Sequence, residues 1–121
     1  MAPAAEGAYR DALAFLFART GGGSKYGLER VRGLLAALGD PHLAVPVFHV
    51  AGTNGKGSTV ATLEALLRAR GLRVAKYTSP HLVDFRERVV VDQAPIAPEA
   101  VVAFVHRWTP TAERLGATFF E

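Results

Sequence analysis

The stretch from His49 to Thr59, HVAGTNGKGST, combines three glycines with a single lysine. Glycines in a turn between a buried strand and a helix leave backbone N–H groups free to converge on one anion. Lys56 can reach the outer phosphates of a nucleotide, while Ser58 or Thr59 can offer a hydroxyl to the Mg²⁺ that the nucleotide carries. The residue types therefore predict a phosphate-binding loop.

The spacing of this loop differs from the standard pattern, in which four residues separate a glycine from Gly-Lys-Ser/Thr. Here Gly52 lies three positions before Gly55, and Gly57 intervenes before Ser58. The alternative is a glycine-rich turn with an incidental lysine, but the expected strand, turn and helix are the setting that the motif requires. Nucleotide binding is the favoured interpretation. The loop alone does not distinguish kinases, ATPases and ATP-dependent ligases.

Hydrophobic periodicity predicts the elements that must position this loop. Helices are expected over Tyr9–Phe17, Leu28–Leu38, Val60–Leu67 and Pro98–Trp108, and strands over Val45–Ala51, Leu72–Tyr77 and Arg88–Asp92. The order strand, loop, helix, strand predicts a βαβ unit, whose two strands usually lie parallel in one sheet. The predicted fold class is α/β.

Length and composition exclude several classes of protein. The 121 residues fit one domain, and half of them are apolar, which allows a packed core. A net charge of +3 is too small and too dispersed for a nucleic-acid binder. The lack of cysteine excludes disulfides, zinc-thiolate sites and a cysteine nucleophile. We expect a cytoplasmic protein with no nucleic-acid or membrane partner, because no signal peptide or membrane span is evident.

Three motifs, HVAGTNGKGST, GLERVRGLLAALGDP and SPHLVDFRERVVV, occur in the order and at roughly the spacing of folylpolyglutamate synthase and dihydrofolate synthase. From about Tyr9 to Glu121 the chain resembles this family of the Mur ligase superfamily, whose variant phosphate loop matches Gly52–Ser58. The resemblance implies a P-loop NTPase-like parallel sheet with flanking helices, of the type of the Mur ligase central ATP-binding domain. Because the chain stops at GATFFE, we expect a truncated N-terminal portion that lacks the C-terminal domain. The expected division is N-terminal helices in 1–44, the βαβ unit in 45–78, and a folate-binding loop, strand and helix in 79–121.

The resemblance also implies the reaction. A pterin-bearing carboxylate would attack the γ-phosphate of ATP to form an acyl phosphate, and the amine of L-glutamate would then displace phosphate. The implied partners are ATP, Mg²⁺, L-glutamate and either dihydropteroate or a reduced folate, bound by a protein that is a monomer when complete. We expect that the 121 residues alone do not catalyse ligation. Another Mur-type amino-acid ligase, a P-loop kinase of small molecules and a non-enzymatic nucleotide-binding module remain as alternatives.

The expected site residues fall into three groups. The nucleotide would be bound by Gly52, Thr53, Asn54, Gly55, Lys56, Gly57, Ser58 and Thr59, with Lys56 as the catalytic residue. The resemblance adds Ser79 to Ser58 as a Mg²⁺ ligand. It also suggests a folate-binding set of Lys25, Tyr26, Gly27, Leu28, His81, Arg86, Arg88, Thr118, Phe119, Phe120 and Glu121.

Each of these side chains also has a purely structural interpretation. Ser79 could be a turn residue before a proline, and His81 a hydrogen-bonding group in a loop. Arg86 and Arg88 would share one face of an extended segment, which could be solvated or could meet an anionic substrate. Two adjacent phenylalanines in TFFE are ordinarily core residues, although they could stack on a flat heterocycle.

Overall fold

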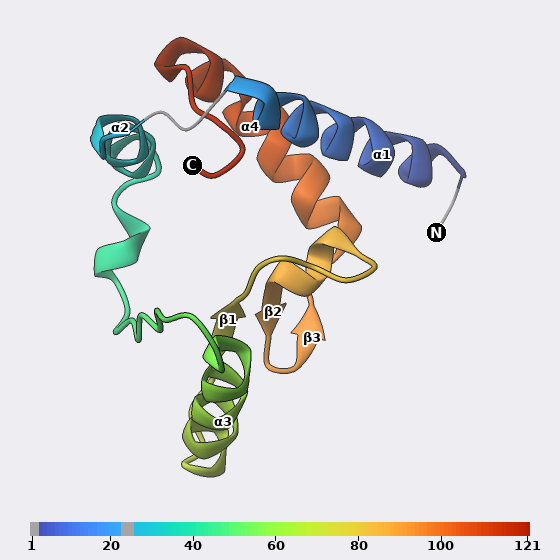
Figure 1. Ribbon diagram of the computed structural model, residues 1–121. Coiled ribbons are helices and arrows are strands. Elements are labelled where there is room, and N and C mark those ends of the chain that lie inside the picture. The colour runs from blue at the N-terminus through green and yellow to red at the C-terminus, as the bar shows by residue number, and fades with distance from the viewer. Residues whose placement is uncertain (1–2, 23–25) are drawn as a thin grey trace. The chain divides into compact units, whose positions relative to one another are not determined.

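The computed structural model describes residues 3–22 and 26–121. The chain divides into two compact units, one formed by Met1–Val47 with Pro98–Glu121, and the other by Phe48–Ala97. We call them unit 1 and unit 2. Helices dominate unit 1, whereas unit 2 combines one helix with a small sheet, so that the fold class is α/β as predicted (Figure 1).

Unit 1 contains the helices expected at the two ends of the chain. Its elements are α1 (Pro3–Ala18), the 3-10 helix η1 (Arg19–Gly22), α2 (Glu29–Ala37), the 3-10 helix η2 (Pro41–Leu43) and α4 (Pro98–Leu115). Pro98 opens α4, where a proline lacks only an N–H that would have no helical partner anyway. After α2, Gly39 takes a left-handed φ of 82°, which ends the helix as the Gly-Asp-Pro signal predicts.

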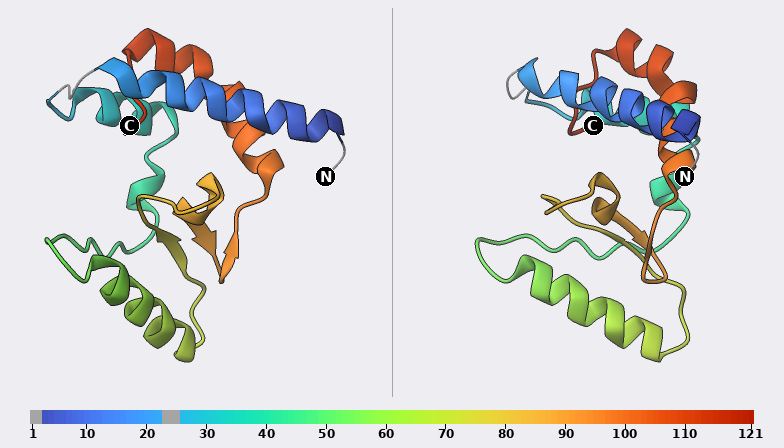
Figure 2. Two further views of the ribbon diagram at one scale, coloured as in Figure 1. Left: turned by 45° about the vertical axis from the view of Figure 1, so that its right-hand side comes forward. Right: turned by 90° about the vertical axis from the view of Figure 1, so that its right-hand side faces the viewer.

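The core of unit 1 lies where α1 and α2 pack against α4 (Figure 2). One stripe of each helix is apolar, and each contributes at least one buried side chain. The buried apolar residues of this unit are Ala12, Leu34, Val101, Val105 and Ala117. Val101 and Val105 are four residues apart on α4 and therefore face the same side of that helix. Helices are formed where the periodicity predicts them, although on α1 the buried residue is Ala12 and Phe17 is 38% exposed.

Unit 2 consists of α3 (Lys56–Ala69), β1 (Ala75–Tyr77), the 3-10 helix η3 (Phe85–Arg88), β2 (Val89–Val91) and β3 (Ala94–Pro95). The three strands form an antiparallel sheet in the order β1-β2-β3. Asp92 and Gln93 join β2 to β3 with φ values of 47° and 69°, as a two-residue hairpin turn with both residues left-handed requires. The side chain of Asp92 also accepts the N–H of Val74, which ties the turn to the start of β1.

The structure does not confirm the predicted parallel βαβ unit. Val45–Ala51 forms no strand, and Val45, Val47 and Phe48 are exposed. The strand predicted over Leu72–Tyr77 is formed at Ala75–Tyr77, but it pairs with β2 in the antiparallel sense. A buried parallel strand needs neighbouring strands at its edges and helices over both faces, and the described residues offer Val45–Ala51 no such neighbours.

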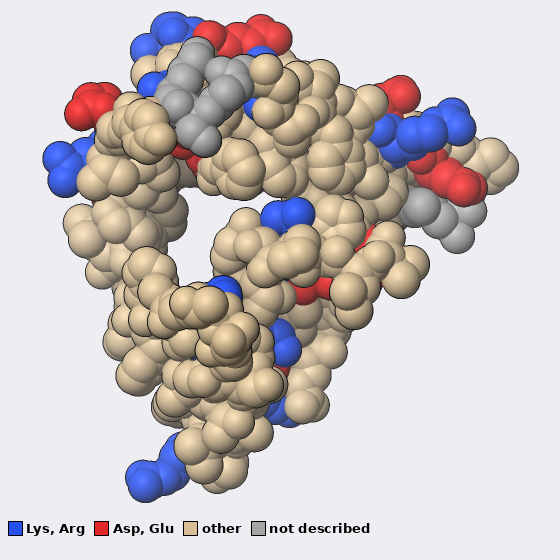
Figure 3. Space-filling view, in the orientation of Figure 1, with Lys and Arg blue, Asp and Glu red and all other residues tan. Residues whose placement is uncertain are grey.

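Among the described residues, no helix is both long and apolar enough to cross a membrane. Charged side chains of both signs are scattered over the face seen in Figure 3, and neither sign forms an extended patch there. The distribution agrees with the dispersed charge expected from the composition.

Candidate functional site

The glycine-rich loop leads directly into the N-terminus of α3, as the sequence predicts. Gly55 precedes the helix with a φ of 76°, a left-handed conformation that residues with a Cβ atom rarely adopt. Gly57 lies inside the first turn, and a Cβ atom placed on it would meet no atom within 4 Å beyond its chain neighbours and the adjacent backbone of α3. The left-handed backbone conformation therefore requires glycine at position 55. At position 57, the packing of the described residues would also allow a larger side chain.

The side chains of this loop are exposed, and their contacts are local. Lys56 donates from Nζ to the carbonyl of Thr53 at 3.1 Å, which folds its ammonium group back over the loop. Thr59 donates from Oγ1 to the carbonyl of Gly55 at 2.9 Å, so its hydroxyl forms a hydrogen bond within the first turn of α3. The unpaired N–H groups at a helix start and one adjacent lysine make a general anion-binding arrangement.

An open hollow of about 590 Å³ lies within unit 2 beside this loop. Gly57 lines it together with Thr78, Ser79 and Leu82, which follow β1. The structure thus brings the first turn of α3 and the predicted metal ligand Ser79 to one hollow.

The expected Mg²⁺ ligands are both hydroxyl groups. Among the described residues, no three or more histidines and carboxylates gather to hold a metal ion by themselves. Mg²⁺ usually keeps several water molecules and takes one or two protein oxygens besides the phosphates of its nucleotide. Hydroxyl oxygens such as those of Ser58 and Ser79 are a donor type that Mg²⁺ accepts, and Ser79 lines the hollow together with Gly57, the residue before Ser58.

A buried ion pair connects α3 to β1. Lys76 donates from Nζ to Oε2 of Glu64 at 2.6 Å, and the Glu64 side chain is only 8% exposed. The other oxygen, Oε1, is buried without a hydrogen-bond partner among the described residues. This pair was not predicted from the sequence, although the position of Glu64, four residues after Val60 on the apolar stripe of α3, indicates burial.

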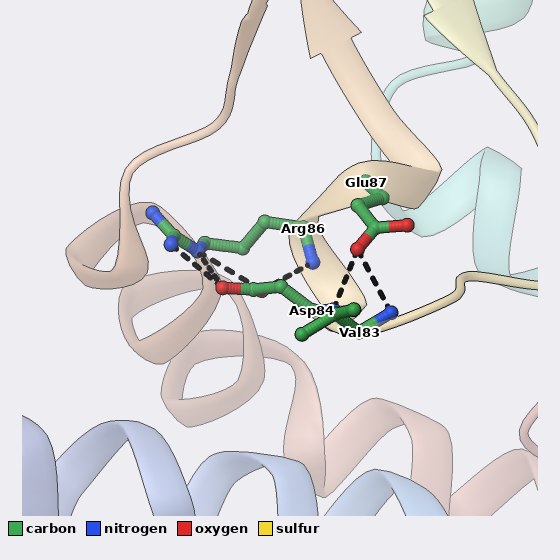
Figure 4. A network of polar contacts seen from close by, with 4 residues as sticks. All are labelled: Val83, Asp84, Arg86 and Glu87. Atoms are coloured by element: carbon green, nitrogen blue, oxygen red, sulfur yellow. Dashed lines mark hydrogen bonds and ion pairs between the residues drawn. The ribbon is translucent and has the colours of Figure 1, made fainter.

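The loop after Ser79 is organised by Glu87 (Figure 4). Its carboxylate accepts the backbone N–H groups of Leu82 at Oε2 and of Val83 and Asp84 at Oε1, over 2.7–2.9 Å. Asp84 in turn accepts the N–H of Arg86, which completes a capping box at the start of η3. The bond from the Asp84 N–H, followed by those from Leu82 and Val83, lowers the pKa of Glu87 below its ordinary value of 4.5.

The capping box corrects the expected position of the two arginines. Arg86 and Arg88 do not alternate along an extended strand, because Phe85–Arg88 forms a 3-10 helix. Arg86 makes a bidentate pair with Asp84, its shortest contact being 2.7 Å from Nη2 to Oδ2. Arg88 donates from Nε to Nδ1 of His81 at 2.8 Å, which leaves Nε2 of His81 to carry the ring proton in the neutral form.

In unit 1 the structure connects the two segments that the resemblance assigns to the pterin. Arg30, in the first turn of α2, donates from Nε to Oε1 of Glu121 at 3.0 Å. Thr118 donates from both its N–H and its hydroxyl to Oε2 of Glu121, each at 2.6 Å. Burial acts to raise the pKa of Glu121, but the bonds from Thr118 and the Arg30 guanidinium outweigh it and lower that pKa.

The two phenylalanines of this segment differ in their surroundings. Phe119 stacks on Phe17 of α1, with ring centroids 5.4 Å apart and an angle of 23° between the planes. Phe120 meets the edge of Phe119 but is 83% exposed. Phe119 therefore matches the structural interpretation of the pair, and only Phe120 presents a largely open ring.

The remaining residues predicted to bind folate are those that precede α2. Tyr26, Gly27 and Leu28 precede α2 and are exposed, and Lys25 lies outside the described residues. Sequence analysis missed Arg30, the residue that joins α2 to Glu121. Arginine within an amphipathic helix is ordinarily a solvated residue, so its sequence position gave no signal.

Proteins of known name match almost the whole chain. A dihydrofolate synthase/folylpolyglutamate synthase of Bacillus subtilis is 43% identical over 92% of this chain and 26% of its own length. A probable bifunctional folylpolyglutamate synthase/dihydropteroate synthase of Haloferax volcanii is 46% identical over 93% of this chain and 14% of its own length. The chain thus spans about a quarter or less of these relatives. No family model matches it.

Solved structures of folylpolyglutamate synthases also match this chain. The folylpolyglutamate synthase of Thermotoga maritima matches with a TM-score of 0.82 and 38% identity, over 90% of this chain and 25% of that protein. A complex of folylpolyglutamate synthase with AMPPCP and folate matches with a TM-score of 0.77 and 32% identity, over 93% and 29%. The enzyme of Mycobacterium tuberculosis, complexed with ADP, matches with a TM-score of 0.70 and 29% identity, over 89% and 26%. By sequence and by structure, this chain belongs to the family of folylpolyglutamate synthases and dihydrofolate synthases.

Proposed function

We propose that this chain carries the phosphate-binding part of an ATP-dependent ligase that adds L-glutamate to a folate. Its relatives are named dihydrofolate synthase, folylpolyglutamate synthase or both, and the proposal includes either a reduced folate or dihydropteroate as the substrate. The observation that carries it is the 43% identity with the Bacillus subtilis enzyme over 92% of this chain. The glycine loop at the start of α3 supplies the site that such a reaction needs.

The proposed chemistry needs positioning more than it needs a protein nucleophile. A carboxylate oxygen of the folate forms a bond to the γ-phosphorus of ATP as the bond to the β-phosphate oxygen breaks, so that ADP leaves. The neutral glutamate amine then attacks the acyl carbon, the bond from that carbon to the phosphate oxygen breaks with its electrons leaving on inorganic phosphate, and one amine proton passes to solvent. Backbone N–H groups at the start of α3 and the Lys56 ammonium would hold the phosphates in line.

The Mg²⁺ ion belongs to the same proposal. Bound to the nucleotide, it would neutralise part of the phosphate charge. The hydroxyls of Ser58 and Ser79 would be its protein ligands. Gly57 has a specific role here, because the absence of a Cβ atom lets the phosphates approach the first turn of α3.

Further parts of the proposal concern the whole protein. We infer a cytoplasmic monomer that binds small molecules and no nucleic acid, in agreement with its modest net charge of +3. We also infer that Val45–Ala51, which has the apolar composition of a buried strand, joins the parallel sheet expected for this family when neighbouring strands are present. The related complex with AMPPCP and folate supports the choice of ATP and folate as ligands.

Replacing Lys56 with alanine tests the nucleotide site. We expect at least a tenfold loss of MgATP affinity by calorimetry, because a charge-assisted contact to phosphate disappears. The melting temperature should stay within about 2 °C, since the side chain is exposed and contacts only its own loop. Arg70→Ala is the matched control, because it removes an exposed cation at the other end of α3. Equal MgATP affinity in the Lys56→Ala and Arg70→Ala variants would exclude Lys56 from the site.

A further inference from the structure

The buried ion pair of Glu64 and Lys76 takes no part in the chemistry proposed above. Nζ of Lys76 donates to Oε2 of Glu64 at 2.6 Å, and Oε1 of Glu64 is buried without a hydrogen-bond partner among the described residues. Removing both charges from water costs free energy, so apolar side chains of similar size often give equal or greater stability than a buried ion pair. A buried oxygen without a partner adds to that cost. Stability alone therefore does not explain the pair.

The pair joins α3 to β1, the two elements of unit 2 that position the proposed Mg²⁺ ligands (Figure 1). Glu64 lies on α3, whose first turn contains Ser58, and Lys76 lies on β1, three residues before Ser79. Glu64 and Lys76 also line the same hollow as Gly57 and Ser79. The ion pair thus holds together the helix and the strand that carry the two hydroxyls to this region.

A second ion pair also ties α3 to the sheet, but it is the weaker of the two. Nη1 of Arg68 lies 3.9 Å from Oδ1 of Asp92, and the two side chains are 33% and 37% exposed. Such pairs contribute little, because water screens both charges. The pair of Glu64 with Lys76 is shorter, and the Glu64 side chain is only 8% exposed. It is therefore the tie that holds α3 against β1 more closely.

A Mg²⁺ ion is sensitive to the distance between its ligands. It demands a nearly ideal octahedron with bonds of about 2.0–2.1 Å, so two hydroxyls from different elements can share one ion only when those elements are held at a fixed separation. Hydrogen bonds along the backbone make a helix rigid over a few turns, so fixing α3 at Glu64 also fixes its first turn. The separation of Ser58 from Ser79 thus depends on the ion pair.

We propose that Glu64 and Lys76 are positioning residues that set the distance between α3 and β1, so that Ser58 and Ser79 can share the Mg²⁺ ion of the nucleotide. The inference rests on the proposed function. Both side chains act through the elements that carry them and do not touch the nucleotide. Without the metal, the phosphates need only the start of α3. The pair should therefore affect the binding of MgATP and not the binding of metal-free ATP.

Nucleotide binding with and without the metal tests this role. Calorimetry on the full protein, expressed from its natural gene and purified, compares ATP in excess Mg²⁺ with ATP in excess EDTA. The ratio of the two dissociation constants is the metal gain, which should be at least about tenfold in the wild type, because the ion adds protein ligands to the nucleotide. In Glu64→Leu/Lys76→Met the metal gain should fall below about threefold, because only a fraction of the molecules would hold both hydroxyls at the required distance. The affinity for metal-free ATP should stay within about twofold of the wild type.

The melting temperature separates positioning from stability. The double variant should melt at or above the wild-type temperature, because apolar side chains replace both buried charges. Glu64→Gln keeps the size of the side chain and weakens the pair, so it should reduce the metal gain at least about threefold, and it provides the test if the double variant does not fold. Arg73→Met is the matched control. It breaks an ion pair of 3.1 Å with Asp92, in which the arginine is 86% exposed, and should leave both affinities unchanged.

A full metal gain in a folded double variant or in Glu64→Gln would overturn the inference. An equal loss of affinity for MgATP and metal-free ATP would do the same, as would the absence of a metal gain in the wild type. The wild-type protein also separates this inference from the proposed function. If it binds no ATP with or without Mg²⁺, the proposed function fails, whereas a wild-type metal gain that the variants keep refutes only the role of the pair.

Discussion

At the scale of single residues, the structure gives the glycines of the glycine-rich loop different roles. Gly55 is required by its left-handed φ of 76°. Gly57 has an ordinary helical conformation and open space where a Cβ atom would stand. Glycine within a helix is less stable than alanine by roughly 0.5–1 kcal/mol. A residue that weakens its helix without a packing reason is therefore best explained by the close approach of a ligand.

Gly57→Ala separates stability from function. We expect the variant to be as stable as the parent chain or more stable by about 0.5–1 kcal/mol, because alanine favours the helix. MgATP affinity should fall at least tenfold, because a methyl group would stand between the first turn and the phosphates. Chemical denaturation and calorimetry on the same samples measure both effects. Unchanged MgATP affinity in a stabilised variant would show that the phosphates do not approach Gly57.

The sequence was most informative for residues whose type and spacing carry their chemistry. Lys56 and its neighbouring glycines predict a phosphate site, because few other residue patterns suit a phosphate. Glu87 and Arg30 could not be predicted in this way, because their roles depend on hydrogen bonds that only the folded backbone creates. For Phe119 the structure favours the interpretation as a packing residue over a folate contact. Its ring stacks on Phe17 of α1, which lies about a hundred residues earlier in the chain.

At the scale of elements, the last four residues are held to α2 by charge. Glu121 accepts Arg30 at 3.0 Å and Thr118 at 2.6 Å, and these partners favour its ionised form. The pKa of Glu121 in the folded chain is therefore lowered from the ordinary value of 4.5, despite the opposing effect of burial. A carboxylate with a lowered folded pKa stabilises the fold above its unfolded pKa and loses that contribution as the pH falls through the folded value.

The stability of unit 1 should accordingly depend on pH through Glu121. Between about pH 5 and pH 3 the wild-type chain should lose more stability than Glu121→Gln, whose side chain cannot be protonated. At pH 7 the variant should be the less stable of the two, because a neutral amide pairs less well with Arg30. Thermal melting across this pH range measures the difference, and Asp11→Asn, at an exposed position of α1, is the control. Parallel pH curves for the wild type and Glu121→Gln would contradict the assigned role.

The helices could be predicted from sequence, because a stripe of apolar residues at helical spacing is a local property. The strands could be predicted less well. Val45–Ala51 has the composition of a buried strand, but a strand exists only when another strand pairs with it. The antiparallel pairing of β1 with β2 could not be predicted from the sequence either. It depends on the loop and the 3-10 helix between the two strands, and the capping box that starts this helix was not expected.

At the scale of the whole molecule, the chain spans 26% of the Bacillus subtilis relative and 14% of the Haloferax volcanii one. Unit 2 contains the glycine-rich loop, Ser79 and the loop fixed by Glu87, and unit 1 contains the segment fixed by Glu121. A ligase differs from a kinase or a nucleotide-binding module in one testable respect. Its use of ATP requires both a carboxylate that accepts the γ-phosphoryl group and an amine that then displaces phosphate from the acyl phosphate.

Glutamate ligation is tested most directly by measuring ADP release by the protein expressed from its natural gene and purified, with MgATP present throughout. Tetrahydrofolate and L-glutamate are each supplied or omitted, dihydropteroate replaces tetrahydrofolate in a parallel series, and Lys56→Ala serves as the inactive control. The account predicts sustained ADP release only when a folate or dihydropteroate and glutamate are both present, with one glutamate incorporated for each ADP released. Sustained ADP release that continues at the same rate without glutamate would contradict it and would identify a kinase or an ATPase instead.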